Sequence, residues 1–328
     1  MKLYLVIPCY NEEEVLPETS KRLKEKYNDL MAAGKISADS KIVFVNDGSK
    51  DRTWEIITEL HAADPIFRGI CLSRNKGHQN ALMAGLMTVK SECDAVISMD
   101  ADLQDDINAI DEMVDRFAEG YEVVYGVRSS RKKDTFFKRT TAQGFYKIMK
   151  GMGVDTVYNH ADYRLMSRRA LEALAEFDEV NLFLRGIVPL VGFKSTQVTY
   201  ERGERFAGES KYPLKKMIAF ATEGITSMSI KPIRMIAALG FFVFLVSIGV
   251  LIYSIIQKFV GFTVPGWAFL AVSIWALGGI QLLAIGVIGE YIGKIYLETK
   301  HRPKYIVAEY LGRDEEGGKE ENGDRKNA

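Results

Sequence analysis

The sequence predicts an α/β fold, in which a mostly parallel sheet flanked by helices is followed by a C-terminal hairpin of two transmembrane helices. Short apolar runs alternate with longer, partly charged segments over the first third of the chain, which is typical of βαβ units. Two later stretches, residues 236–256 and 259–289, contain no charged residue. A helix needs roughly 20 apolar residues to cross a bilayer, so both stretches are long enough.

The composition narrows the class of protein. The chain has 328 residues, which suits one large domain or two ordinary ones. Its formal net charge is zero, so nothing favours nucleic acid as a partner. Three cysteines without paired or metal-ligand spacing indicate reduced thiols. The N-terminal apolar run is too short for a signal peptide, and we expect it to form the first strand of a cytosolic domain.

Each strand of the predicted sheet is a short apolar run that stops at a polar residue, a proline or a turn. The first run stops at Pro8, the second at Asn46-Asp47-Gly48-Ser49 and the fourth at Asp100. The helices between the strands are longer and carry charge on one face. In chain order the expected strands are 2–8, 41–45, 69–72, 94–99 and 122–125, and the expected helices are 13–33, 53–62, 79–89 and 107–118.

Beyond residue 127 the pattern loosens. We expect a basic loop at 129–139, a helix at 140–152, strands at 163–166 and 196–200, and a polar loop at 201–212. Residues 213–229 have apolar side chains near helical spacing, which suits a helix in the membrane interface or an ordinary amphipathic surface helix. Their place just before an apolar stretch favours the interface. The charged tail is expected to be disordered after about residue 312.

The charges that flank the apolar stretches predict the orientation of the hairpin. Lysines and arginines cluster before the first stretch and after the second, whereas the connecting loop has only Lys258. By the positive-inside bias, both ends of the hairpin face the cytoplasm. The alternative is a pair of buried core helices. The predicted organisation is a cytosolic domain over 1–212, juxtamembrane helices over 213–232, a hairpin over 233–298 with spans at about 235–257 and 265–290, and a cytosolic tail over 299–328.

Two carboxylates at the end of the fourth strand are the most informative residues. Asp100 and Asp102 follow the apolar run directly, and Gln104 adds an amide oxygen. Hard oxygen ligands of this kind suit Mg²⁺ or Mn²⁺, which often accompany phosphates. In open α/β sheets, ligands bind beyond the carboxyl ends of the strands. The alternative is an ordinary solvated loop, since acidic residues often gather there.

The first and second strands end in polar residues that belong at the same edge. Tyr10 could stack on a base, and Asp47 could accept a hydrogen bond from a base N–H or a ribose hydroxyl. Acidic strand ends gathered at one edge are costly unless a cation or donor groups offset them. The chain has no GxGxxG after its first strand and no P-loop motif, which argues against a dinucleotide-binding domain and a P-loop enzyme.

These motifs together resemble a known family. Pro8-x-Tyr10-Asn11-Glu12, Asn46-Asp47-Gly48-Ser49, Asn75-Lys76-Gly77 and Asp100-Ala101-Asp102-Leu103-Gln104 are similar to motifs of the family-two glycosyltransferases with a GT-A fold. More narrowly, they resemble the dolichol-phosphate mannose synthase-like branch, the bacterial polyprenyl-phosphate glycosyltransferases. The likeness extends from residue 2 to about residue 302. The chain departs from it at Asn46, where many relatives have aspartate, and at His78, to which we assign no role.

The resemblance implies roles for individual residues. The nucleotide sugar would be bound by Pro8, Tyr10, Asn11, Glu12, Asp47, Lys76, Asp100 and Ala101. A Mg²⁺ or Mn²⁺ ion would be bound by Asp102, Gln104 and Asp100. Asp162 matches the position of a general base. The diphosphate and the lipid phosphate would be bound by Arg128, Arg131, Lys133, Arg205, Ser210, Lys211 and Tyr212, although the basic loop could instead be drawn to anionic lipid.

The implied function is inverting sugar transfer from a nucleotide sugar to polyprenyl phosphate, expected to be undecaprenyl phosphate, at the inner membrane of a bacterium. The product would serve modification of cell-envelope glycans. UDP-glucose is the donor that we expect first, and UDP-N-acetylglucosamine, mannose and aminoarabinose donors are the alternatives. A phosphate monoester has its second pKa near about 6, so the acceptor is largely ionised at neutral pH. We therefore expect Asp162 to act at least partly by positioning the acceptor or the sugar.

Two other functions were weighed against this one. A processive polysaccharide synthase would need a Gln-x-x-Arg-Trp motif, and no tryptophan in this chain follows an arginine. A catalytically silent membrane scaffold that binds a nucleotide or lipid is the alternative from another class, which the intact carboxylates disfavour. Gly289 and Gly293 form a small-xxx-small pair that could support helix contacts within the chain or in a homo-oligomer.

Overall fold

The computed structural model describes residues 1–129, 151–152, 160–203, 222, 224–260 and 266–312. Within them, eight strands form one sheet in the order β7-β5-β6-β4-β1-β2-β3-β8. The strands are β1 (Leu3–Cys9), β2 (Lys41–Asn46), β3 (Phe67–Leu72), β4 (Ala95–Ser98), β5 (Val123–Arg128), β6 (His160–Ser167), β7 (Ser195–Tyr200) and β8 (Val307–Leu311). The helices are α1 (Leu16–Ala32), α2 (Thr53–Ala63), α3 (His78–Val89), α4 (Ala109–Ala118), α6 (Arg168–Ala175), α7 (Leu184–Leu190), α9 (Lys231–Val260) and α10 (Trp267–Thr299).

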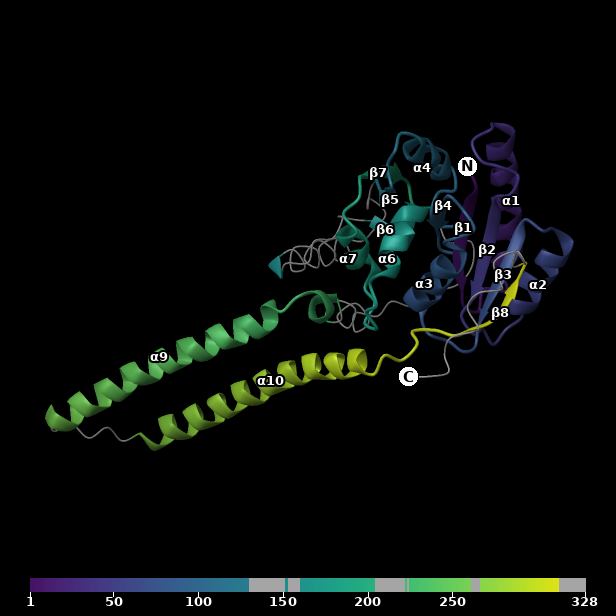
Figure 1. Ribbon diagram of the computed structural model, residues 1–328. Helices are drawn as coiled ribbons and strands as arrows, with labels where there is room; N and C mark the ends of the chain where they lie inside the picture. Colours follow the sequence, from purple (N-terminus) through teal and green to yellow (C-terminus); the bar gives the residue numbers. More distant parts are fainter. Residues whose placement is uncertain (130–150, 153–159, 204–221, 223, 261–265, 313–328) are drawn as a thin grey trace, which may run out of the picture.

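The centre of the sheet is parallel and covered on both faces. β1 pairs in parallel with β2 and β4, and β2 pairs in parallel with β3. All the residues of β1 are buried, which explains why its sequence is a continuous apolar run rather than an alternating one. Buried side chains of α1, α2 and α4 pack on one face, and those of α3, α6 and α7 pack on the other (Figure 1).

The sheet is mixed, because the βαβ pattern of its first four strands does not continue. Four of the seven described pairings are parallel, as the prediction of a mostly parallel sheet requires. β6, however, runs antiparallel between β4 and β5. β5 therefore lies beside β6 and β7 and not beside β4, its predecessor in the chain. This insertion carries Asp162, which lies within β6, to the edge where β4 ends.

Two element boundaries differ from the prediction in ways that matter for the site. β5 extends to Arg128, three residues beyond the expected end of the strand at residue 125, so this arginine is the last residue of a strand. α3 begins at His78, one residue earlier than expected, directly after Gly77 at φ 86°. The predicted helix at 140–152 falls almost entirely outside the described residues.

The chain that follows the hairpin returns to the sheet, which the sequence analysis did not foresee. β8 pairs antiparallel with β3 and protects what would otherwise be an exposed edge (Figure 1). Arg68 of β3 donates to the hydroxyl of Tyr310 at 3.1 Å, and that hydroxyl donates to Glu92 at 3.0 Å. Part of the segment 299–312, namely β8, therefore belongs to the sheet of the α/β domain. The disorder predicted after residue 312 concerns residues outside those described.

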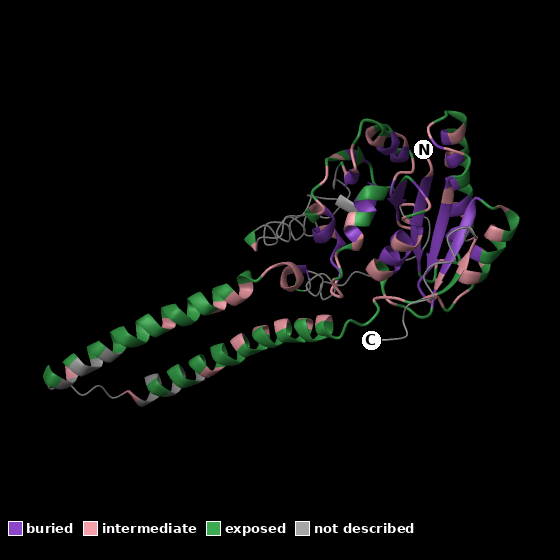
Figure 2. Cartoon of the chain, viewed as in Figure 1, coloured by how far each residue is buried: buried purple, intermediate pink, exposed green. Residues whose placement is uncertain are grey.

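The two C-terminal helices project from the α/β domain as an antiparallel pair (Figure 1). Residues Lys231–Val250 of α9 and Ala276–Thr299 of α10 are long and apolar enough to cross a membrane, and none of either window is buried. Their large apolar side chains are exposed, for example Phe241 at 63% and Leu282 at 72% (Figure 2). The alternative of two buried core helices is therefore wrong. α10 also continues nine residues beyond the expected span, to Thr299.

Candidate active site

The ends of β1, β2 and β4 meet at one edge of the sheet. Cys9 at the end of β1 is in register with Asn46 at the end of β2, and the amide of Asp47 donates to the carbonyl of Cys9 at 2.9 Å. The amide of Met99, just after β4, donates to the carbonyl of Val6 at 3.2 Å. The polar residues that follow these strands therefore lie at the same edge, as the parallel pairing predicts.

The residues after β1 build a rigid rim with the loop after β2. Asn11 adopts φ 54°, and its side-chain oxygen accepts from the amide of Lys50 at 2.9 Å. Its amide donates to the hydroxyl of Ser49 at 3.0 Å, and the amide of Glu12 donates to Thr53 at 2.9 Å. Asn11 thus holds two loops together, and the neighbouring Tyr10 is left 43% exposed. Pro8, by contrast, is a buried residue of β1.

Asp47 is buried and receives two backbone hydrogen bonds. Its carboxylate oxygens accept from the amides of Lys76 at 2.6 Å and Gly77 at 2.9 Å. Burial nevertheless raises its pKa above the usual aspartate value, against the effect of the two amides. Gly48 packs so tightly on the same turn that an added Cβ would lie 2.5 Å from the amide nitrogen of Asn75. Asp47 therefore fixes the turn that leads into α3.

We expect Asp47→Ala to weaken both the fold and the binding of a nucleotide. The change leaves the amides of Lys76 and Gly77 without their acceptor, and an unsatisfied buried polar group costs about 1–3 kcal/mol. The midpoint of thermal unfolding and the dissociation constant of UDP, measured by calorimetry, should both shift. Asp39→Ala removes an exposed carboxylate and is the matched control. Unchanged UDP binding in Asp47→Ala would contradict the role.

Asp162 is surrounded by two arginines and a histidine. Arg164 donates to Oδ1 at 2.7 Å, and Arg185 of α7 donates to Oδ2 at 3.2 Å. Nε2 of His78 lies 3.7 Å from Oδ2 of Asp162 and 3.6 Å from Oδ1 of Asp100. Burial alone would raise the pKa of Asp162, but the charge of Arg185, the hydrogen bond with His78 and the charge of Arg164 hold it well below the usual range. These contacts therefore favour the ionised form of Asp162.

The structure corrects the interpretation of His78 as a residue without a role. It stands at the first position of α3, and its ring bridges the carboxylates of Asp100 and Asp162. Burial lowers its pKa, but the hydrogen bond with Asp162 and the charge of Asp100 outweigh this and raise it. The sequence contained one indication that His78 lies at the site, namely its position directly after the motif Asn75-Lys76-Gly77. Arg185 offered no such signal, because it lies in an unremarkable apolar segment.

Asp100 and Asp102 lie in a crowded acidic loop. Burial, followed by the neighbouring charges of Asp105, Asp162 and Asp102, raises the pKa of Asp100 to about 6, against the effect of His78. Asp105 is also buried, and its Oδ2 has no hydrogen-bond partner among the described residues. Like charges held this close in a partly buried loop are relieved by a cation. The loop therefore fits a divalent metal.

Asp100 and Asp102 provide two carboxylates as possible donors for a metal ion. No group of three or more His, Cys, Asp or Glu side chains suited to a metal occurs in the part of the chain that the structure describes. Mg²⁺ usually takes only one or two carboxylates and completes its shell with water and substrate phosphates, and a pair such as Asp100 and Asp102 matches that requirement. Oε1 of Gln104, the third predicted ligand, accepts from Arg202, while Oδ1 of Asp102 accepts from the amide of Gln104 at 3.1 Å.

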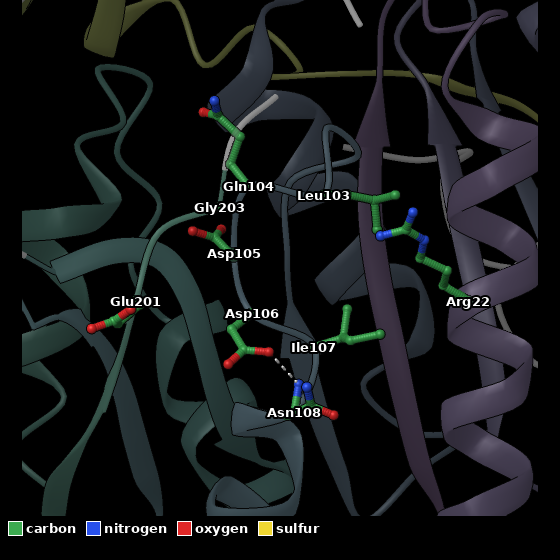
Figure 3. Close-up of a pocket in the computed structure, with 9 residues that line it drawn as sticks. All are labelled: Arg22, Leu103, Gln104, Asp105, Asp106, Ile107, Asn108, Glu201 and Gly203. Carbon is green, nitrogen blue, oxygen red and sulfur yellow. Dashed lines mark hydrogen bonds between the residues drawn. The ribbon is translucent and has the colours of Figure 1, made fainter. Parts of the chain in front are cut away.

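The loop that follows these carboxylates lines a small pocket of about 270 Å³ (Figure 3). The loop is closed by the amide of Gly203, which donates to the carbonyl of Gln104 at 2.8 Å. Asp106 points toward the start of α4, where it accepts from the amide of Asn108 at 2.9 Å. The lining residues are Arg22, Leu103, Gln104, Asp105, Asp106, Ile107, Asn108, Glu201 and Gly203.

Arg128, a predicted phosphate ligand, makes internal contacts in this structure. Its guanidinium lies 3.5 Å from Asp105 and 3.4 Å from the hydroxyl of Tyr200, which in turn donates to Asp105 at 2.5 Å. Ala101 is buried, and its carbonyl accepts from Thr19 at 2.8 Å. The remaining predicted phosphate and acceptor ligands, Arg131, Lys133, Arg205, Ser210, Lys211 and Tyr212, lie outside the described residues.

Comparison with known proteins agrees with this geometry. Residues 4–175 match the model of glycosyl transferase family 2. The uncharacterized glycosyltransferases YkoT and YkcC of Bacillus subtilis (strain 168) are 56% and 44% identical over 93% and 94% of this chain, and the alignments cover 90% and 94% of those proteins. A bactoprenol glucosyl transferase of Shigella phage SfV is 43% identical over 94% of this chain and 98% of that protein.

The family match and the architecture support the same conclusion. The matched region spans more than half of the chain and runs from β1 to the end of α6. A mixed sheet with helices on both faces, followed by two apolar helices, agrees with the GT-A fold and C-terminal hairpin expected from the motifs. The chain belongs to glycosyl transferase family 2.

Proposed function

We propose that this protein transfers glucose from UDP-glucose to a polyprenyl phosphate and inverts the configuration at the anomeric carbon. The observation that carries the proposal is the likeness to the bactoprenol glucosyl transferase of Shigella phage SfV, which extends over 94% of this chain and 98% of that protein. The likeness therefore includes the two apolar helices as well as the α/β domain. These helices are consistent with an acceptor that resides in the membrane.

The donor site is proposed to lie at the carboxyl edge of β1, β2 and β4. Tyr10 is exposed at the rim, where a base could stack on its ring. Asn11, Glu12 and Asp47 hold the loops that form the rim, and Lys76 follows in the turn that Asp47 fixes. The nucleoside would thus be bound by a prearranged surface.

Asp100 and Asp102 are the residues proposed to hold Mg²⁺ or Mn²⁺. When bound there, the ion would offset the negative charge that develops on the leaving diphosphate. The ion would also relieve the repulsion that raises the pKa of Asp100. Arg202, which reaches Gln104 in this structure, would lie beside the same phosphates.

Asp162 is proposed to position the reacting groups and not to act as a strong general base. Its pKa is held well below the usual range, so it has little tendency to accept a proton. The acceptor phosphate needs no strong base, because its second pKa is near about 6. Asp162 instead aligns Arg185 and His78, two cations that could orient the acceptor phosphate. A phosphate oxygen would then attack the anomeric carbon opposite the leaving UDP.

The hairpin is proposed to cross the membrane twice, with the α/β domain and both chain ends in the cytoplasm. The excess of lysine and arginine at the two ends of the hairpin supports this orientation. UDP-sugars are made in the cytoplasm, so the donor would be available on that side. The product would then be a sugar carried on a lipid at the cytoplasmic face.

A transfer assay tests the proposed function. Membranes that contain the protein would be incubated with undecaprenyl phosphate and, in turn, radiolabelled UDP-glucose, UDP-N-acetylglucosamine and GDP-mannose. We expect label to enter the lipid fraction from UDP-glucose and to be released by mild acid. If the label enters from another nucleotide sugar, the proposed donor is wrong and the proposed acceptor is retained. No label from any donor would contradict the proposal and favour a silent scaffold.

A further inference from the structure

Glu298 connects the membrane hairpin to the catalytic domain. It lies in the last turn of α10, well beyond the uncharged stretch that ends at residue 289. Its carboxylate accepts from the amide of Val180 at 2.8 Å and from the amide of Asn181 at 2.9 Å. The side-chain amide of Asn181 donates to the same carboxylate at 2.7 Å. Two consecutive backbone amides therefore converge on one ionised side chain, and charge-assisted hydrogen bonds of this kind are the strong ones.

The segment held by Glu298 leads directly into α7, which carries Arg185. Asn181 is only four residues before Arg185, and Arg185 donates to Asp162. Both backbone groups of Leu184, the first residue of α7, are hydrogen-bonded to residues near Asp162. Its amide donates to Gln79 of α3 at 2.9 Å, and its carbonyl accepts from Arg164 at 3.4 Å. A shift of residues 180–181 would therefore move the arginine that pairs with Asp162.

The hairpin contacts this segment at further points. Lys304, which follows α10, donates to the carbonyl of Phe177 at 3.0 Å and lies 3.4 Å from Asp178. Just before α9, Met228 packs on α7 so closely that a Cβ on Gly186 would lie 2.9 Å from the Cε of Met228. α10 is also joined to the residues just before α9, because Tyr291 donates to the carbonyl of Ser229 at 2.5 Å. Both ends of the hairpin thus contact α7 or the segment before it.

We propose that Glu298 is a positioning residue for the transfer reaction. It holds α7 so that Arg185 pairs with Asp162, and it thereby makes the geometry of the site depend on how the hairpin is seated in the membrane. This inference rests on the proposed function, since it assigns the Asp162–Arg185 pair to acceptor handling. It goes further in naming a residue of the membrane hairpin as part of the catalytic arrangement.

The first test measures the contact itself and needs no activity. Hydrogen exchange of residues 177–190 would be compared in the full-length protein and in Glu298→Ala, both in lipid nanodiscs. We expect exchange at Val180 and Asn181 to rise roughly tenfold or more, with a smaller rise in α7. Glu298→Gln, which keeps one acceptor oxygen, should give an intermediate result. Glu290→Gln neutralises an exposed carboxylate on the same helix and should leave exchange unchanged.

The second test is a double-mutant cycle on transfer to undecaprenyl phosphate. We expect Glu298→Ala to lower kcat about 10–100-fold, because small misplacements of a site cost this much, while KM for UDP-glucose stays within about twofold. Since Glu298 acts through Arg185, the double variant Glu298→Ala/Arg185→Ala should be no slower than Arg185→Ala alone. Partial recovery of kcat in Glu298→Gln would separate positioning from misfolding.

Three results would overturn the inference, and they differ from failure of the proposed function. The first is unchanged exchange at residues 180–181 in Glu298→Ala. The second is an additive loss of rate in the double variant. The third is a fall in UDP binding equal to the fall in kcat, which indicates general destabilisation. If the wild-type protein transfers no glucose at all, the proposed function fails, but the exchange measurements still decide whether Glu298 orders α7.

Discussion

Removal of divalent cations with EDTA is expected to abolish sugar transfer, and excess Mg²⁺ or Mn²⁺ is expected to restore it. Asp102→Asn should lower kcat by about a thousandfold even at saturating metal, because a bound metal ion contributes several kcal/mol of charge stabilisation. The physical reason lies in the crowded loop, where burial and neighbouring carboxylates raise the pKa of Asp100 to about 6. Label transfer from UDP-glucose at a series of metal concentrations measures the effect.

The matched control for this prediction is Asp106→Asn. Asp106 belongs to the same acidic loop, but its carboxylate accepts from the amide of Asn108 at the start of α4 (Figure 3). Its replacement should therefore leave the metal requirement unchanged. Full activity in the presence of EDTA, or equal losses in the two variants, would show that the carboxylates of Asp100 and Asp102 do not hold a catalytic metal.

Asp162→Asn is expected to be both inactive and less stable. The change leaves Arg164, which is 2% exposed, beside a neutral amide, and breaking a buried ion pair typically costs about 3–5 kcal/mol. Arg185 and His78 lose their common partner at the same time. We expect a lower midpoint of thermal unfolding together with a loss of transfer of at least about a hundredfold.

The dependence on pH separates a positioning role for Asp162 from a general base. Its pKa is lower in the folded protein than the ordinary carboxyl value of about 3.9, so its contribution to stability is complete above that value and is lost as the pH falls through the folded-state pKa. Between pH 6 and 8 its charge does not change. The activity profile of the wild-type protein in that range should therefore follow His78 and Asp100, whose pKa values are raised, and show no titration of Asp162 itself.

An exposed carboxylate close in the chain provides the control for Asp162. Glu172 lies on α6, just after β6, and is exposed. Glu172→Gln should change neither stability nor transfer, since a single exposed charge contributes little. If Asp162→Asn were nearly as active as Glu172→Gln, the contacts of Asp162 with Arg164, Arg185 and His78 would have only a structural role.

Much of the fold was predictable because its signals are local. The apolar runs of β1, β2 and β4 and the acidic and turn residues that end them are adjacent in the chain, so their position at one edge of the sheet followed from parallel pairing. The predicted edge with Tyr10, Asp47, Asp100 and Asp102 is present. The two long apolar helices were equally predictable, since each follows from an uncharged stretch of sufficient length.

The residues that the sequence analysis missed are those whose role depends on distant contacts. β6 inserts antiparallel between β4 and β5, and that non-local pairing brings Asp162 opposite His78 of α3. Arg185 reaches the same carboxylate from α7, whose sequence is apolar and gives no hint of a site. β8 was not expected, because this short strand follows two long apolar helices and pairs with an edge more than 200 residues earlier.

The sequence by itself determined the parallel core, the acidic edge, the family and the two apolar helices. Each of these depends on residue types and spacings within a short segment of the chain. Only the tertiary structure decided which cations surround Asp162, that Arg128 faces Asp105, and that Glu298 holds the segment before α7. Apart from Arg164, which lies two positions from Asp162, these contacts join residues between 23 and 118 positions apart. Such pairings depend on how the whole sheet and hairpin pack together, and no local pattern encodes that packing.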